Sequence, residues 1–273
     1  MKKLIKKTKS EKSKKPLFIA GPCVIENRDI TLFTAETLAK IKNKLKLNLI
    51  FKSSYRKANR TSLKGFTSIG FESALKILTE IKKEFGLPIL TDVHSVEEVL
   101  LVKDYVDVLQ IPAFLCRQTD LLIEAGNSGK IVNIKKGQFL APIDMKYPIE
   151  KVLSTGNKNI LVTERGTSFG YHDLVVDMRG LVQMKNFGFP VIMDVTHSVQ
   201  KPSAGDGISS GVPEFIFPLA RAAAAVGVDG FFIETHPEPK NALSDAASQL
   251  KLDQFEKLVT EIISIDEARK NII

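Results

Sequence analysis

The chain has 273 residues, 44% of them hydrophobic, which is enough to bury a large core within one domain. Its formal net charge is +8, but eight lysines against Glu11 alone give residues 1–15 a charge of +7, and this arm contains no aromatic residue, so we expect no nucleic-acid partner. No apolar segment follows the lysines as in a signal peptide, and charges interrupt even the apolar region 222–233, so neither secretion nor membrane insertion is predicted.

After a basic, flexible arm over residues 1–15, short apolar runs alternate with amphipathic segments through a single domain over residues 16–273. The predicted strands are Leu17–Ala20, Leu47–Phe51, Pro88–Val93, Val106–Ile111, Lys130–Ile134, Asn159–Thr163, Pro190–Val195 and Gly230–Ile233. The predicted helices are Thr31–Lys44, Glu72–Glu84, Val96–Lys103, Asp120–Ala125, Ile149–Leu153, Leu174–Asn186, Glu214–Ala225 and Leu252–Arg269.

These eight strand and helix pairs indicate a parallel sheet covered by helices, because the strands are too continuously apolar for a sheet with one solvated face. We predict a closed (β/α)8 TIM barrel. The competing topology is a doubly wound open sheet, which is typically followed at its first strand by a glycine-rich nucleotide loop. Gly21-Pro22-Cys23 is not such a loop, and this favours the barrel.

A basic stretch follows the second predicted strand. Lys52, Arg56, Lys57 and Arg60 lie within nine residues that contain no acid, and Ser53, Ser54, Asn59 and Thr61 add hydroxyl and amide groups. Arginine and lysine side chains on one loop are typical of a phosphate site, so an anionic substrate is predicted. A solvated basic turn is the alternative interpretation of this stretch alone.

In a barrel the ends of the strands converge on one mouth, where active sites are built. Residues at or just past those ends are Cys23, Lys52, Asp92 with His94, Gln110, Lys135 with Lys136, Arg165, His197 and Glu234. A purely structural barrel needs none of these charged or metal-binding groups, because its closing layers are filled by branched apolar residues. The series therefore predicts an active site.

The last strand of a closed barrel pairs with the first, so Cys23, His197 and Glu234 are expected to be neighbours, with Asp245 folding back from the following loop. Thiolate, imidazole and carboxylates together suit a divalent transition metal such as zinc, iron or manganese. His236 is a weaker ligand candidate than His197. Cys116 is interpreted as a small buried apolar residue, and two cysteines so far apart fit the reducing cytoplasm.

Seven sequence blocks resemble the 3-deoxy-D-manno-octulosonate 8-phosphate synthases. They are GPCVIE at 21–26, KANRTS at 57–62, QIPAFLCRQTD at 110–120, NIKKGQF at 133–139, TERG at 163–166, DVTHSVQ at 194–200 and ETHP at 234–237. The resemblance implies a cytoplasmic (β/α)8 enzyme, generally a homotetramer, that condenses phosphoenolpyruvate with D-arabinose 5-phosphate and releases phosphate. Its product belongs to Kdo and lipopolysaccharide biosynthesis.

The resemblance also implies roles for individual residues. Phosphoenolpyruvate is assigned to Lys52, Ser54, Lys57, Gln110, Lys135 and Arg165, and the aldose phosphate to Asn59, Arg60 and Thr61, with Phe114 and Arg117 from a neighbouring subunit. Cysteine at position 23 is the mark of the metal-dependent class of this family, with Cys23, His197, Glu234 and Asp245 as the ligands. Catalytic roles are predicted for Lys57, Lys135 and Asp245.

Two positions depart from the family pattern and concern the aldose-phosphate pocket. Arg56 stands where many members have Asp, and Thr67-Ser68 replaces Arg-Gly, so the two changes are a candidate compensatory exchange of a cation. Residues 201–211, rich in Gly and Ser, are predicted to form a loop and are a candidate lid.

Three other functions stay open at this point. The related heptulosonate 7-phosphate synthases use erythrose 4-phosphate, but they usually carry a Pro-Arg-Thr loop in place of the block at 57–60. A Schiff-base aldolase with Lys52 or Lys135 would be trapped by borohydride. A noncatalytic phosphate-binding or nucleic-acid-binding barrel would explain the arm but not the grouped Cys23, His197 and Glu234.

Overall fold

The computed structural model describes residues 15–58, 65–205 and 208–272. The predicted basic arm lies outside the described residues except for Lys15, whose Nζ donates to the Leu45 carbonyl oxygen at 2.6 Å. Asn59, Arg60 and Thr61, which the family resemblance assigns to the aldose phosphate, also lie outside them.

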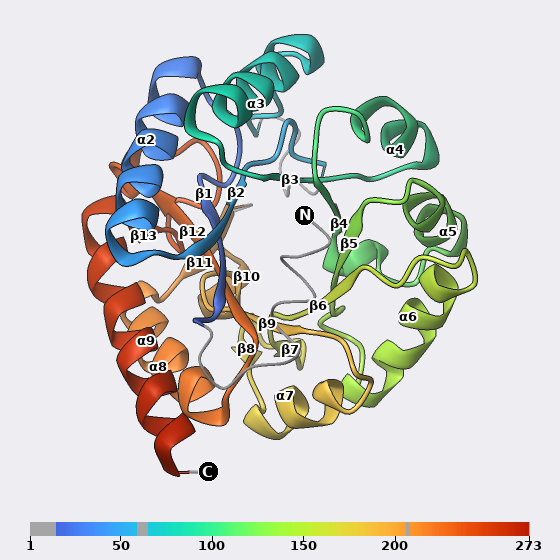
Figure 1. The fold of residues 1–273 in the computed structure, drawn as a ribbon, viewed down its shortest axis with the longest axis vertical. Coiled ribbons are helices and arrows are strands. Elements are labelled where there is room, and N and C mark those ends of the chain that lie inside the picture. The colour runs from blue at the N-terminus through green and yellow to red at the C-terminus, as the bar shows by residue number, and fades with distance from the viewer. Residues whose placement is uncertain (1–14, 59–64, 206–207, 273) are drawn as a thin grey trace.

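Eight parallel strands close into a barrel (Figure 1). The strands are β1 (Leu17–Gly21), β2 (Asn48–Lys52), β3 (Ile89–Asp92), β4 (Val108–Ile111), β5 (Ile131–Lys135), β6 (Ile160–Glu164), β9 (Val191–Asp194) and β12 (Gly230–His236). Each pairs in parallel with the next, and β12 pairs with β1 in the register Ala20 to Ile233 and Gly21 to Glu234. The predicted (β/α)8 barrel is confirmed, and the open sheet is excluded because the first and last strands are paired.

Helices follow the strands and form the outer ring of Figure 1. They are α2 (Arg28–Leu45), α3 (Phe71–Phe85), α4 (Val96–Val102), α5 (Thr119–Asn127), α6 (Lys146–Leu153), α7 (Met178–Lys185), α8 (Ile216–Val226) and α9 (Phe255–Ile272). Local chemistry sets several of their ends. Asn27 caps α2 by accepting from the Ile30 N–H at 2.9 Å, and α3 buries Ala74, Leu75 and Leu78 at helical spacing.

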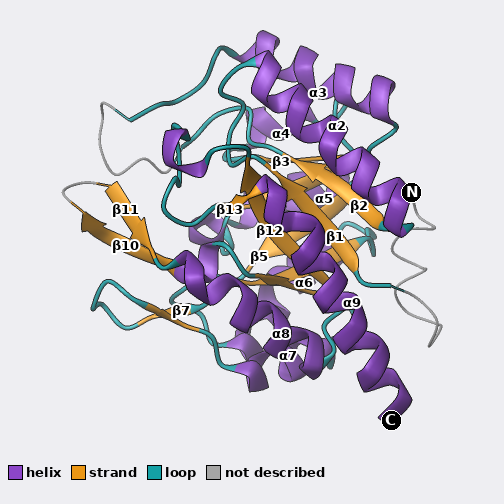
Figure 2. Cartoon of the chain, turned by 90° about the vertical axis from the view of Figure 1, so that its left-hand side faces the viewer, coloured by secondary structure: helices purple, strands orange, loops and turns teal. Residues whose placement is uncertain are grey.

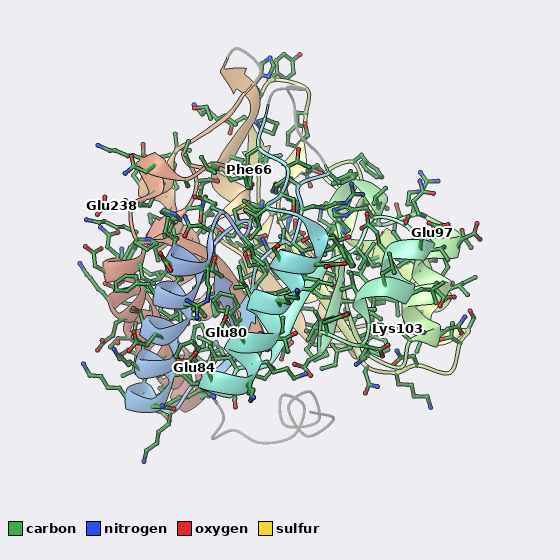
Figure 3. All side chains as sticks on the ribbon, turned by 90° about the horizontal axis from the view of Figure 1, so that it is seen from above. Phe66, Glu80, Glu84, Glu97, Lys103 and Glu238 are labelled. Carbon is green, nitrogen blue, oxygen red and sulfur yellow. The ribbon has the colours of Figure 1, made fainter. Side chains whose placement is uncertain are left out.

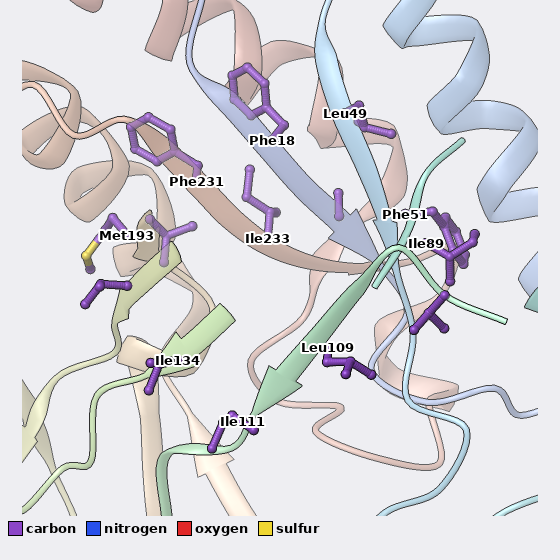
Figure 4. Close-up of a cluster of buried hydrophobic side chains, with 14 of the residues drawn as sticks. Phe18, Leu49, Phe51, Ile89, Leu109, Ile111, Ile134, Met193, Phe231 and Ile233 are labelled. Carbon is purple, nitrogen blue, oxygen red and sulfur yellow. The ribbon is translucent and has the colours of Figure 1, made fainter. Parts of the chain in front are cut away.

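Two apolar layers hold the barrel together. One fills its interior with side chains from all eight strands: Leu17, Ile19, Ile50, Leu90, Val108, Ile131, Leu161, Ile192 and Phe232. The other lies between the sheet and the helices, where Phe18, Phe51, Leu109, Phe231 and Ile233 point away from the barrel axis (Figure 4). The interior is therefore a packed core, and chemistry is confined to the ends of the strands.

Two predicted segments differ from the structure. Leu174–Asn186 was expected to be one helix, but Leu174–Val175 forms β8, which pairs with β7 (Thr167–Ser168), and Asp177 then caps α7 by accepting from the Arg179 N–H at 2.9 Å. The predicted loop at 201–211 is a hairpin of β10 (Gln200–Gly205) and β11 (Ile208–Gly211). Figure 2 shows β7 and the β10–β11 hairpin projecting from the same side of the barrel.

A short strand, β13 (Leu250–Lys251), extends the sheet beside the end of β12. It anchors the chain that returns from Asp245 to α9. None of the helices in the described part of the chain combines the length and apolar character that crossing a bilayer requires.

Candidate active site

The structure brings the predicted functional residues to one end of the barrel. Cys23, Lys52, Asp92, Gln110, Lys135, Arg165, His197 and Glu234 lie at or just past the carboxyl ends of eight different strands. Most are buried, and Lys52 and Lys135 are only 2% and 4% exposed. A lysine is rarely buried to this degree unless its ammonium group is paired, so the partners of these side chains decide what the site can do.

A close approach of two strands places the first of these residues. Gly21 ends β1 with φ +154°, and a Cβ there would lie 2.1 Å from the Lys52 carbonyl oxygen, so only glycine fits. The chain then turns across the mouth, where Lys52 Nζ donates to the Cys23 carbonyl oxygen at 2.8 Å and to Glu234 Oε1 at 2.5 Å. Lys52 therefore joins β1, β2 and β12.

Three of the four predicted metal ligands form a compact group. Ligand atoms of Cys23, Glu234 and Asp245 all lie within 4.8 Å of one another, and Cys23 Sγ is 3.0 Å from Asp245 Oδ2. Lys57 Nζ is 3.1 Å from the same sulfur and 3.1 Å from Asp245 Oδ2. The basic stretch after β2 thus reaches the thiol directly.

His197 lies beside this group. Its Nε2 is 3.5 Å from Glu234 Oε2 and 4.0 Å from Asp245 Oδ2, while its Nδ1 is 2.8 Å from Asp194 Oδ2. A carboxylate at Nδ1 places the ring proton on that nitrogen and leaves the Nε2 lone pair facing the two other carboxylates. The imidazole is thereby oriented as a candidate fourth ligand.

The donor set fits a divalent transition metal. A thiol, two carboxylates and an imidazole offer the sulfur, oxygen and nitrogen atoms that zinc, iron and manganese accept. Glu234 Oε2 is buried and has no hydrogen-bond partner among the described residues, an arrangement that is costly unless a cation is bound there.

The pKa of the Cys23 thiol also favours a bound cation. Burial, followed by the carboxylates of Asp245 and Glu234, raises the pKa of Cys23 well above its usual value, against a smaller opposing effect of Lys57. A thiolate at this position therefore needs additional positive charge. A divalent cation held by the same residues would supply it.

Lys135 and Arg165 form the cationic side of the mouth together with Lys52. Lys135 Nζ is 2.6 Å from Asp194 Oδ2 and 3.7 Å from the centre of the Phe232 ring, and Arg165 Nη2 donates to Gln200 Oε1 at 2.7 Å. Burial lowers the pKa of Lys135 and of Arg165 despite nearby carboxylates. Burial also opposes the charge of Lys52, but Glu234, Cys23 and Asp92 together outweigh it and raise the pKa of Lys52. An anionic ligand at this place would stabilise all three charges.

Comparison with known proteins agrees with this geometry. Residues 4–271 match the profile of the DAHP synthetase I family. A 2-dehydro-3-deoxyphosphooctonate aldolase of Syntrophotalea carbinolica is 54% identical over 248 residues, which cover 91% of this chain and 90% of that protein. Proteins of the same name from Geobacter sp. strain M21 and Brucella abortus strain S19 are 54% and 53% identical, over 91% and 92% of this chain and 91% of each relative.

The chain belongs to the 2-dehydro-3-deoxyphosphooctonate aldolase family. This is a second name for the octulosonate 8-phosphate synthases, so the resemblance read from the seven sequence blocks is confirmed.

One departure from the aldolase family pattern has a structural explanation. The guanidinium group of Arg56 pairs with the Glu98 carboxylate on α4, and the Lys57 N–H donates to the Thr67 carbonyl oxygen at 2.8 Å. Segments 56–57 and 67–68 therefore lie side by side. A cation at position 56 and one at position 67 would serve the same region, as expected for a compensatory exchange.

The remaining predicted substrate residues lie at different depths of the mouth. Ser54 is buried beside Cys23, since its N–H donates to the Cys23 carbonyl oxygen at 3.1 Å, and Gln110 accepts from Asn133 at 3.0 Å. Phe114 and Arg117 are exposed. Their exposure leaves both side chains available to a neighbouring molecule.

Two buried acids of the candidate site were not predicted from the sequence. Asp194 holds both Lys135 and His197, and Glu164 Oε1 accepts from the N–H groups of Arg165 and Gly166 at 2.9 and 2.7 Å. Both acids end a predicted or observed strand, which was a usable signal. Asp194 meets Lys135, which ends another strand, only in the folded barrel, whereas the partners of Glu164 are the next two backbone N–H groups of its own segment.

Proposed function

We propose that this chain condenses phosphoenolpyruvate with D-arabinose 5-phosphate and water to give 3-deoxy-D-manno-octulosonate 8-phosphate and phosphate. Family membership supports this reaction. The observation that carries it is the meeting of a cationic set and a metal-capable set at one mouth, where Lys57 lies 3.1 Å from both Cys23 Sγ and Asp245 Oδ2. Two phosphorylated substrates need the first set, and an aldehyde that becomes an alkoxide needs the second.

Phosphoenolpyruvate is assigned to the buried cations. Lys52, Lys135 and Arg165 face its carboxylate and phosphate, with Ser54 and Gln110 as neutral hydrogen-bonding partners. Because the two lysines already neutralise Glu234 and Asp194, substrate binding redistributes an existing charge balance rather than burying new charge alone. Lys57 and Lys135 then offset the negative charge that gathers where the two substrates meet.

The bond-forming step joins C3 of phosphoenolpyruvate to the aldehyde carbon while water adds at C2, which afterwards loses phosphate. Positioning supplies much of the rate, because the two reacting carbons must be held at contact distance. Asp245 would orient the aldose hydroxyls and take up a proton. Cys23, His197, Glu234 and Asp245 would hold a zinc, iron or manganese ion, which polarises a carbonyl oxygen or lowers the pKa of bound water.

The aldose phosphate is assigned to Asn59, Arg60 and Thr61, with Phe114 and Arg117 from a neighbouring subunit. This arrangement needs an oligomer, and we assign a homotetramer in the cytoplasm. The exposure of Phe114 supports this part, since 43% of its surface is accessible on the isolated subunit. A neighbouring subunit that covered this side chain would bury its apolar surface.

Phosphate release tests the function. Turnover is expected with phosphoenolpyruvate plus arabinose 5-phosphate and not with erythrose 4-phosphate, the substrate of the related heptulosonate enzymes. Treatment with a chelator should abolish turnover, and zinc, manganese, iron or cadmium should restore it to different degrees. Preference for erythrose 4-phosphate would overturn the substrate assignment, while turnover that survives chelation would overturn only the metal assignment.

A further inference from the structure

Glu26 is a buried acid that the proposed mechanism does not use. It lies three residues after Cys23 and is 7% exposed. Its Oε1 accepts from the Leu243 N–H at 2.8 Å, a contact that crosses 217 residues of sequence. Leu243 precedes Asp245 by two residues, so this hydrogen bond ties the segment of the candidate thiol ligand to the loop of a candidate carboxylate ligand.

The second oxygen of Glu26 faces His236. His236 Nε2 is 3.7 Å from Glu26 Oε2, and both side chains are almost fully buried. The other ring nitrogen, Nδ1, accepts from the Glu238 N–H at 3.0 Å, which leaves the ring proton on Nε2. That nitrogen has no hydrogen-bond partner within the described ranges, so Glu26 is the acid that compensates it.

His236 ends β12 two residues after Glu234. Glu26 is therefore connected to all three members of the compact group: along the chain to Cys23, through the Leu243 amide to Asp245, and through the His236 ring to Glu234. Asp245 itself needs such support, because it adopts the left-handed conformation with φ +50°, which costs free energy in any residue except glycine.

We propose that Glu26 is a positioning residue that holds the Asp245 loop and the end of β12 against the Cys23 segment. It thereby sets the spacing of the compact group of Cys23, Glu234 and Asp245, called the ion-binding group below. This inference rests on the proposed metal function. Outer residues that orient ligands typically change metal affinity by about 10- to 100-fold when they are replaced. Glu26 fits that role through the backbone rather than through a ligand side chain.

Two variants separate the contacts of Glu26. Glu26→Gln keeps an oxygen for the Leu243 N–H but presents an amide N–H to the His236 ring, whereas Glu26→Ala removes both contacts. Glu80→Ala is the matched control, since Glu80 pairs with Arg28 on the outer surface of α3 (Figure 3). Amide hydrogen exchange at Leu243 reports the hydrogen bond to Glu26 in the absence of any metal. Glu26→Ala is expected to accelerate this exchange about tenfold, and Glu26→Gln to change it little.

Cadmium titration of the chelated full-length protein, followed by the ultraviolet absorbance of the cadmium–thiolate bond, reports the ion-binding group. Glu26→Ala should weaken cadmium binding about 10- to 100-fold, Glu26→Gln less, and Glu80→Ala not at all. If Glu26→Ala fails to fold, Glu26→Gln alone tests the proposal, which requires its cadmium affinity to be lower than that of the wild type. A wild-type band with unchanged affinity in the Glu26 variants overturns the positioning role, while the absence of the wild-type band contradicts the metal site itself.

Discussion

Lys57 Nζ lies 3.1 Å from the sulfur of Cys23, which makes the basic stretch after β2 part of the same cluster as the thiol. Lys57 lowers the pKa of Cys23, but burial and the neighbouring carboxylates of Asp245 and Glu234 have larger effects and raise it. Lys57 in turn gains from the cluster: burial opposes its charge, but Asp245 and Cys23 raise its pKa well above the usual value. The substrate cations and the candidate ion ligands are thus energetically coupled.

The two cysteines should respond differently to replacement. Cys23→Ala is expected to lower phosphate release by more than about 100-fold and to abolish the cadmium–thiolate absorbance, because it removes a candidate ligand at the centre of the mouth. Cys116→Ala should keep both signals, since this thiol packs against Gly137 away from the ion-binding group. Equal losses in the two variants would speak against a ligand role for Cys23.

Asp194→Asn tests the carboxylate that orients His197. Asp194 lies 2.8 Å from His197 Nδ1 and 2.6 Å from Lys135 Nζ, and it is completely buried. An amide in its place no longer enforces the Nδ1–H tautomer, so metal affinity should fall about 10- to 100-fold. The affinity is obtained by dialysing the protein against a graded series of chelator concentrations and measuring the zinc that remains bound by elemental analysis. Unchanged affinity together with reduced turnover would assign Asp194 to Lys135 alone.

The sequence predicted the barrel because its strands are buried on both faces and read as continuous apolar runs. It also predicted Cys23, Lys52 and Glu234, because strand ends of a closed barrel must meet. Glu26 and Asp194 were missed since their partners, Leu243 and Lys135, are brought close only by the closed fold. The hairpins at 167–175 and 200–211 were missed for other reasons: Leu174 and Val175 were assigned to the following helix, and the Gly- and Ser-rich segment 201–211 is typical of a loop.

Lys136 is expected to stabilise the mouth although it faces no substrate in the proposal. Its fully buried Nζ lies 3.2 Å from the carbonyl oxygens of Gly137 and Leu140 and 3.4 Å from Glu164 Oε1. Lys136→Met leaves these oxygens without a cation and should lower the free energy of unfolding by about 3–5 kcal/mol. Urea unfolding measures the change. Lys40→Met, which breaks only an exposed pair with Glu36, is the matched control and should cost almost nothing.

A smaller loss in Lys136→Met, comparable with that of the Lys40 control, would mean that water replaces the ammonium group. Steady-state kinetics provide a second test of Lys136→Met, through the contact between Glu164 and Arg165. Because Glu164 accepts from the Arg165 N–H, displacement of Glu164 should raise the KM for phosphoenolpyruvate more than it lowers kcat.

His94 lies between two carboxylates, Asp92 at the end of β3 and Glu98 near the start of α4. Its Nε2 is 3.0 Å from Asp92 Oδ2 and its Nδ1 is 2.8 Å from Glu98 Oε2, which also pairs with Arg56. Burial opposes protonation of the ring, but the two carboxylates prevail and raise the pKa of His94 to about 9. The same contacts lower the pKa of Glu98 to about 2 despite its burial. His94 is therefore protonated and positively charged throughout the neutral pH range.

This pair of carboxylates gives stability a defined pH dependence. A histidine whose folded pKa is raised contributes fully below its unfolded pKa of about 6.5, and the contribution is lost as the pH rises through about 9. Relative to His94→Gln, which cannot titrate, the wild-type chain should lose about 3 kcal/mol of unfolding free energy between about pH 6 and pH 10. Urea unfolding of both proteins across this range measures the difference. Parallel curves would show that folding leaves the pKa of His94 unchanged, because only a difference in bound protons between the folded and unfolded states can separate them.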